Sequence, residues 1–184
     1  GLETKIHIKQ SNPLIDALGI GMEIESRDVI IEGSLGSSTV VKGKSIIITG
    51  QTHKTSDIKG KNIEINTHRG ILEGEDIKIT RLESGTVQGK NVYIGQAISG
   101  TINADNVYIE RLESNCIINA TSKIEILQMF GSENTFNITP RSSIKSKEIL
   151  GEFIDEKNAS KLLLKLNRSF SILEKRHNDI KSTM

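Results

Sequence analysis

Residues 87–94, VQGKNVYI, contain the pattern that decides the fold: an aliphatic residue, a polar residue, glycine, two polar residues, and then β-branched residues on either side of Tyr93. Three further copies with the same glycine occupy residues 41–48, 58–65 and 72–79. Residues 102–109 repeat the pattern with alanine in place of glycine, and a looser copy with one inserted residue follows from 118 to 126. A fixed internal period of this kind indicates a repeat protein.

The length of the repeat follows from the first β-branched residue after each polar pair. These residues lie 17, 14, 15, 15 and 17 positions apart, at Ile46, Ile63, Ile77, Val92, Val107 and Ile124. Val29 and Ile138 extend the series at its two ends, so we expect about eight coils. Units this short cannot hold the helices of tetratricopeptide or leucine-rich repeats, which leaves a coil made of strands alone.

The alternation within each unit defines the expected interior. Residues that are two apart in a strand point to the same face, so each β-branched pair should face inward. We therefore predict an all-β protein, a single-stranded parallel β-helix (solenoid) stacked at about 4.8 Å per coil, with a flat β-meander as the alternative. The residues predicted to be almost fully buried are Ile63, Ile65, Ile77, Ile79, Val92, Ile94, Val107 and Ile109.

The corners of the coils carry small and turn-forming residues. Glycines such as Gly60 and Gly74 are expected to adopt positive φ there, with the Asn or Asp two positions later tolerating the same region. A second set of small residues recurs just before each unit and is expected to line a narrow interior corner. Its members are Thr39, Ser56, Gly70, Gly85, Gly100 and Cys116.

The amino-acid composition agrees with a protein made of strands and limits the partners and the cellular compartment that we expect. Isoleucine occupies 30 of the 184 positions, whereas aromatic residues make up 3% and Trp is absent. The net charge of +1 gives no global reason to expect nucleic-acid binding, and no apolar run suggests membrane insertion. A single cysteine cannot form an internal disulfide, so we expect a reducing, cytoplasmic location.

Four segments are expected along the chain. Residues 1–24 form an N-terminal cap or stub with a short strand at Ile6 and Ile8, residues 25–140 form the β-helix, and residues 141–154 form a linker. Residues 155–184 show heptad rather than strand spacing, which predicts a C-terminal α-helix. This helix is either a truncated coiled coil or an amphipathic cap on the last coil, with a helical hairpin as a further possibility. The chain starts with Gly and its heptads stop in mid-pattern, so we expect a fragment of a longer protein.

The coils with the pattern G-K-N-[IV]-x-I, the stretch GSEN at 131–134 leading to Ile138-Thr139-Pro140, and the heptad segment together resemble the flagellar assembly protein A family. The resemblance covers about residues 24 to 184. It implies a polymerisation-related bacterial β-helix, akin to bactofilins and to the C-terminal domain of the septum-site inhibitor of the Min system. The implied function is a structural or scaffolding role in flagellar assembly, at the cell pole or flagellar base, with no catalytic residues to transfer. Family members usually carry a separate N-terminal domain, which this chain lacks.

No catalytic, cofactor-binding or metal-binding residue is predicted. The aspartates Asp57, Asp76 and Asp105 lie at unlike or corner positions and do not build the carboxylate pair of glycoside hydrolysis. His53 and His68 are 15 residues apart, but both lie in polar segments and are expected at the surface without a third ligand. A carbohydrate-active enzyme is therefore the least favoured of three hypotheses, behind a scaffold and a bactofilin-like cytoskeletal polymer.

Partner binding has two candidate places on the coils and one on the helix. Tyr93 and Tyr108 project outward at the same position of adjacent coils, as either a binding surface or a ladder that shields the sheet. Arg81 and Arg111 lie two coils apart in the repeated sequence RLES, as either a docking strip or ordinary ion-paired surface. Homo-oligomerisation is expected through the heptad positions Leu163, Leu166, Phe170 and Leu173. The expected partners are other proteins, including flagellar ones.

Overall fold

The structure is a computed structural model that describes residues 3–140 and Lys175. The chain divides into one compact unit at residues 1–139 and a second at residues 140–184. The linker 141–154 and the heptad positions Leu163, Leu166, Phe170 and Leu173 lie outside the described residues.

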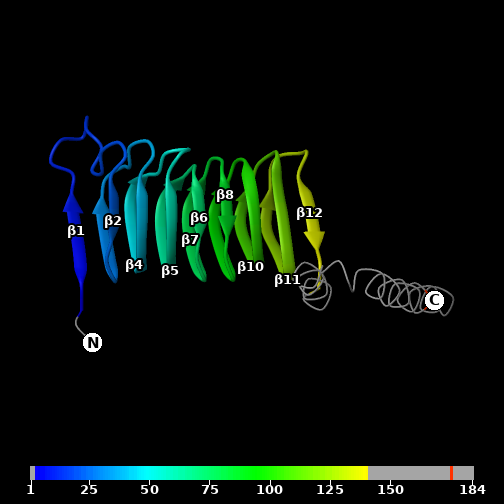
Figure 1. Cartoon of the computed structure of the whole chain (residues 1–184). Helices are drawn as coiled ribbons and strands as arrows, with labels where there is room; N and C mark the ends of the chain where they lie inside the picture. Colours follow the sequence, from blue (N-terminus) through cyan, green and yellow to red (C-terminus); the bar gives the residue numbers. More distant parts are fainter. Residues whose placement is uncertain (1–2, 141–174, 176–184) are drawn as a thin grey trace, which may run out of the picture. The chain divides into compact units, whose positions relative to one another are not determined.

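The first unit is a parallel β-solenoid in which each strand pairs with strands one coil before or after it. Figure 1 shows the strands side by side along one axis, from β1 at one end to β12 at the other. The strands are β1 (Lys5–Lys9), β2 (Glu23–Glu25), β3 (Asp28–Glu32), β4 (Val40–Gln51), β5 (Asp57–His68), β6 (Ile71–Glu73), β7 (Asp76–Leu82), β8 (Thr86–Gln88), β9 (Asn91–Ala97), β10 (Gly100–Leu112), β11 (Cys116–Met129) and β12 (Thr135–Ile138).

The register of the sheet follows the sequence period. Ile63 pairs with Ile77, Ile77 with Val92 and Val92 with Val107, as the repeat predicts. The residue inserted in the last copy produces a register shift between β10 and β11 after Ala104. A bulge of this kind accommodates an extra residue without moving the rest of the pairing.

The number of coils is about seven, and the expected eighth does not close within the described residues. Ile138 was expected to continue the series of Ile124, but it pairs with Ala120 instead. The last unit therefore adds one strand, β12, to one face of the solenoid. At the other end, β1 pairs in register with β3, so the strand predicted at Ile6 and Ile8 extends the sheet.

The interior consists of aliphatic columns along the axis. All eight residues predicted to be buried have an exposed fraction of 3% or less. A further column lies five residues earlier in each coil and is fully buried at Val41, Ile58, Leu72, Val87 and Ile102. Burying one such side chain stabilises a fold by about 1.5–3 kcal/mol, so stacked columns rather than any single contact stabilise the solenoid.

The corner glycines serve a different purpose from the one expected. Gly60 and Gly74 do not have positive φ, and neither do the Asn and Asp residues that follow them. A Cβ at Gly60 would instead lie 2.5 Å from the carbonyl oxygen of Gly43 in the preceding coil, so close backbone stacking requires glycine there. Positive φ occurs at Gly85 and Gly100, in the small-residue column, where φ is 91° and 130°.

Candidate functional site

The two tyrosines form a stacked pair on the outside of the solenoid. Tyr93 pairs in register with Tyr108, between Lys78 on one side and Glu125 on the other. The rings lie 4.9 Å apart between centroids with an interplanar angle of 11°. The predicted adjacency is therefore present, and both side chains are partly exposed.

The hydroxyl of Tyr93 is held by an acidic neighbour. It donates a hydrogen bond to the carboxylate of Glu110, which raises the pKa of Tyr93 to about 12. The phenol therefore stays protonated at neutral pH and keeps its hydrogen for this bond. The contact fixes the orientation of one ring of the pair, which makes the surface more rigid than two free tyrosines would be.

A groove of about 620 Å³ runs along the axis beside this pair. Its lining includes Tyr93, Tyr108 and the edges of the inward residues Ile77, Val92 and Val107. The lining extends from Ser45 to Lys123, across six rungs of the sheet, which corresponds to roughly 24 Å at the strand spacing.

The opposite border of the groove is a ladder of side-chain amides. Asn106 Nδ2 donates to Asn91 Oδ1 at 2.9 Å, and Asn91 Nδ2 donates to Asp76 Oδ1 at 2.8 Å. These are the residues that the sequence placed at the corner of each coil. Their ladder bonds use one donor of each amide, so the second N–H of Asn91 and of Asn106 can point to a bound group.

The arginine strip is separate from this groove. Arg81 and Arg111 lie in one outward row with Gln96 between them, as the repeat predicts, and neither lines the groove. Arg81 pairs with Glu83 at 3.1 Å and Arg111 pairs with Glu113 at 2.7 Å. The Arg111 hydrogen bond, with a second from Gln96, lowers the pKa of Glu113.

Arg111 has a further intramolecular contact that the sequence did not suggest. Its guanidinium carbon lies 3.9 Å above the ring centre of Phe130 in the next coil. A cation over an aromatic face is attracted to it. Both arginines are thus engaged within the solenoid, which favours the ion-paired interpretation of this strip over the docking interpretation.

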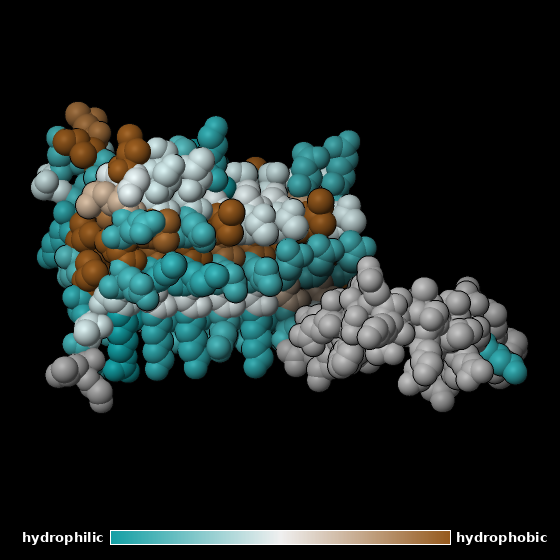
Figure 2. Space-filling model, in the orientation of Figure 1, coloured by the Kyte–Doolittle hydropathy of each residue, from teal (hydrophilic) through white to brown (hydrophobic). Residues whose placement is uncertain are grey.

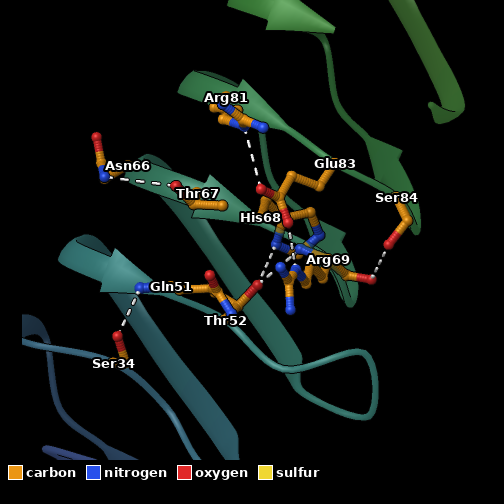
Figure 3. Close-up of polar contacts among 10 residues, drawn as sticks. All are labelled: Ser34, Gln51, Thr52, Asn66, Thr67, His68, Arg69, Arg81, Glu83 and Ser84. Carbon is orange, nitrogen blue, oxygen red and sulfur yellow. Dashed lines mark hydrogen bonds and ion pairs between the residues drawn. The ribbon is translucent and has the colours of Figure 1, made fainter. Parts of the chain in front are cut away.

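His68 corrects the expectation of a surface histidine. It is fully buried in the interior column that Leu82 and Ala97 continue in later coils. Thr52 Oγ1 donates to His68 Nδ1 at 2.9 Å (Figure 3). His68 Nε2 donates to the carbonyl oxygen of Gly70 at 2.9 Å. The signal was present in the sequence, because His68 precedes Leu82 by 14 residues, the same interval as Ile63 to Ile77.

The environment of His68 keeps it neutral and structural. Burial lowers the pKa of His68 to about 4, although backbone hydrogen bonds involving Gly70 and Thr86 act in the opposite direction. Thr52 Oγ1 also accepts a hydrogen bond from the backbone N–H of Arg69, so the threonine is satisfied as well. A neutral imidazole with both nitrogens bonded inside the fold supports the coil rather than a substrate.

Cys116 lies where the small-residue column predicted it. The side chain is fully buried, and burial raises the pKa of its thiol to about 11. A thiol with a raised pKa is a poor nucleophile at neutral pH because little thiolate forms. This cysteine therefore packs as a small apolar residue.

Within residues 3–140 no cluster of three or more His, Cys, Asp or Glu side chains could hold a metal ion. In the part of the chain that the structure describes, no helix has both the length and the apolar character needed to cross a membrane. Comparisons of the chain with known protein families, with curated proteins and with solved structures found no match.

Proposed function

We propose that this chain is a non-enzymatic scaffold module that binds partner proteins along the tyrosine groove, the surface between the Tyr93–Tyr108 stack and the amide ladder. The observation that carries the proposal is the stacked pair in the wall of a long groove that Ile47 also lines. Aromatic side chains that are already ordered give a large contact area at low entropic cost, which is why tyrosine is enriched at binding hot spots.

The dimensions of the tyrosine groove define the occupant. An extended peptide advances about 3.3 Å per residue, so roughly seven residues would fill a groove of this length. Its apolar side chains would contact Ile47, Tyr93 and Tyr108, and its backbone would meet the free amide hydrogens of Asn91 and Asn106. We therefore assign the groove to an extended, partly apolar segment of a partner protein.

The cellular setting of the proposal rests on the sequence. The resemblance of the coils to the flagellar assembly protein A family supports a role in flagellar assembly or polar positioning, in the cytoplasm of a bacterium. The heptad positions between 155 and 184 support homo-oligomerisation through a coiled coil. A single cysteine that is buried and unpaired supports a reducing compartment.

One observation favours a cytoskeletal polymer as the second candidate. Among the described residues, the second half of β11, from Lys123 to Met129, pairs only with β10. The outer edge of β1 is likewise without a strand partner within residues 3–140. Open edges at both ends of a parallel solenoid can pair with further copies, which would give filaments visible by electron microscopy of the purified chain.

Site-specific photo-crosslinking tests the assignment of the groove. The full chain carries a photoreactive phenylalanine at Tyr93 or, as a control on another face, at Gln88 of β8. A partner captured only from Tyr93 is identified by mass spectrometry, purified and bound to the unlabelled chain. We expect the double variant Tyr93→Ala/Tyr108→Ala to lower the affinity by about tenfold or more, and Thr86→Ala/Gln88→Ala to leave it unchanged. Equal affinity of the tyrosine variant and the wild type would contradict the proposal.

A further inference from the structure

A second surface of the solenoid carries an unusual arrangement of lysines. The sequence KGK occurs at residues 42–44 and again at 59–61, and the two copies stack in register. Lys42 lies against Lys59, and Gly43 lies against Gly60. We call this surface, made of Arg27, Lys42, Lys44, Lys59 and Lys61, the lysine corner.

Most of the charges at the lysine corner lack an intramolecular counterion. Lys59 pairs with Glu73 at 3.2 Å, but within the described part of the chain no ion pair involves Arg27, Lys42, Lys44 or Lys61. Like charges at directly opposed positions of neighbouring strands destabilise a sheet. The opposed cations therefore lower the stability of the sheet at this corner, and locally unfavourable arrangements of this kind are expected at functional sites.

The rows continue differently beyond the corner. Following Lys42 and Lys59, the row changes to Glu73 and then to Gln88. The row of Lys61 likewise changes to Glu75, whose backbone N–H bonds to the carbonyl of Lys61. Glu25 precedes Lys42 in register at the other end. The positive stretch is thus short and has carboxylates on both sides.

A recess of about 680 Å³ lies between the two lysine rows. Its lining includes Gly43 and Gly60, all five cations of the lysine corner, and the carboxylates Glu25 and Glu75 that border the positive stretch. The side of the solenoid shown in Figure 2 has hydrophilic rows along the axis with a paler strip between them. Since close backbone stacking excludes a Cβ at Gly60, no side chain can fill the recess at that rung.

We propose that the lysine corner binds a short acidic segment of a partner protein, with two or three carboxylates placed between the lysine rows. The charge pattern favours this occupant over a polyanion. Nucleic acids and anionic membranes need an extended positive surface, whereas here carboxylates border a stretch of about three rungs, or roughly 10 Å along the axis. The overall charge of +1 also provides no long-range attraction for a polyanion.

The lysine corner is independent of the tyrosine groove. The two recesses share no lining residue, although both extend over β4 and β5, where Lys44 precedes Ser45 and Lys61 precedes Asn62. A scaffold with two such surfaces could hold two segments at once. Failure of one assignment therefore leaves the other intact.

Binding of a labelled peptide tests the proposal. The probe is a fluorescein-labelled peptide of about ten residues with a run of glutamates in its middle, and its counterpart has glutamines in their place. Fluorescence anisotropy with the full chain is measured at about 50 mM and about 300 mM NaCl, since screening weakens contacts between exposed charges. We expect the glutamate peptide to bind about tenfold or more tightly than the glutamine peptide at low salt, and the difference to shrink at high salt.

Charge-reversal variants identify the surface that binds. Lys44→Glu/Lys61→Glu should remove the preference for the glutamate peptide, whereas Lys9→Glu/Lys54→Glu makes the same change of net charge at exposed positions outside the recess and should retain it. Tyr93→Ala/Tyr108→Ala should also retain it. Equal binding of the two peptides, or equal loss in both lysine variants, would overturn the proposal. Tighter binding of oligothymidylate or of phosphatidylglycerol vesicles would overturn the choice of a protein segment.

Discussion

The inner and outer faces of β7, β9 and β10 follow opposite rules, although they are formed by alternate residues of the same strands. On the inner face, Ile79, Ile94 and Ile109 succeed one another without change and are fully buried. On the outer face, Lys78, Tyr93 and Tyr108 occupy adjoining positions in the same register. The fold thus depends on a repeated inner column, and the outer column is available for specific chemistry.

The largest test of this contrast places the same substitution on the two faces of one strand. Ile79→Asp would bury a carboxylate among aliphatic side chains, and we expect it to lower the free energy of unfolding by about 4 kcal/mol or more. Lys78→Asp, one residue away on the outer face, should change it by less than about 0.5 kcal/mol. Urea denaturation followed by circular dichroism measures both. A stable, fully folded Ile79→Asp chain would contradict the assigned register.

His68 is a fully buried histidine in a mostly aliphatic interior, and lowering the pH should test its contribution to stability. Because the folded pKa of His68, about 4, lies below its ordinary value of 6.5, its neutral form stabilises the fold fully above pH 6.5. That contribution is lost as the pH falls from 6.5 towards 4 and amounts to about 3 kcal/mol. The free energy of unfolding, measured by urea titration at each pH, should decrease accordingly.

Two histidine variants separate this effect from the titration of carboxylates. His68→Leu should lose the acid-dependent decrease, while Thr52 and Gly70 lose a hydrogen-bond partner and the protein is weakened at pH 8 by about 1–3 kcal/mol. His53→Gln should retain the decrease because His68 is still present. An identical pH dependence in wild type and His68→Leu would show that His68 does not cause it.

The tyrosine stack should contribute little to folding. Tyr93→Ala/Tyr108→Ala removes one aromatic contact on the surface, and we expect the free energy of unfolding to fall by about 1 kcal/mol. Thermal denaturation of the double variant and of each single variant measures this. A loss of several kcal/mol would mean that the pair shields the sheet as a structural ladder, the alternative that the sequence left open.

The smallest expected effect has the opposite sign. Lys44→Glu replaces the middle one of three successive cations, Arg27, Lys44 and Lys61, by an anion, and we expect it to raise the free energy of unfolding by about a few tenths of a kcal/mol. Raising the salt concentration should reduce the gain because the charges are exposed. If Lys44→Glu instead destabilises the fold, the stacked lysines are not under repulsion.

The sequence predicted those features that depend on the repeat alone. The buried columns, the pairing of Tyr93 with Tyr108 and the row of Arg81, Gln96 and Arg111 all follow from a constant period. Three other features depend on contacts between adjoining coils, and the sequence pattern did not predict them. The burial of His68 follows from a further interior column that His68 shares with Leu82 and Ala97. The role of the corner glycines was predicted wrongly because their close contact is with the preceding coil. An eighth coil was expected at Ile138, which instead pairs with Ala120.

Of the two proposed binding surfaces, the sequence pattern predicted only the tyrosine pair. The tyrosines stand out because they are the only two in the chain, whereas the lysine corner is visible only when the two KGK sequences are superimposed. The contact of Arg111 with Phe130 joins residues from a regular and an irregular part of the last coils, so no period could predict it. Side-chain pairing at such places depends on geometry that a sequence pattern does not contain.

Because the register from β7 through β9 to β10 is unbroken, each repeat in this block adds one step of constant height along the axis. Inserting or deleting one 15-residue repeat in this block, such as the interval from Ile77 to Val92, would move all later residues by one step of about 4.8 Å. Their direction around the axis would be unchanged. The distance between the lysine corner and the Tyr93–Tyr108 pair is therefore adjustable in whole steps, by duplication in evolution or by design, without altering either surface.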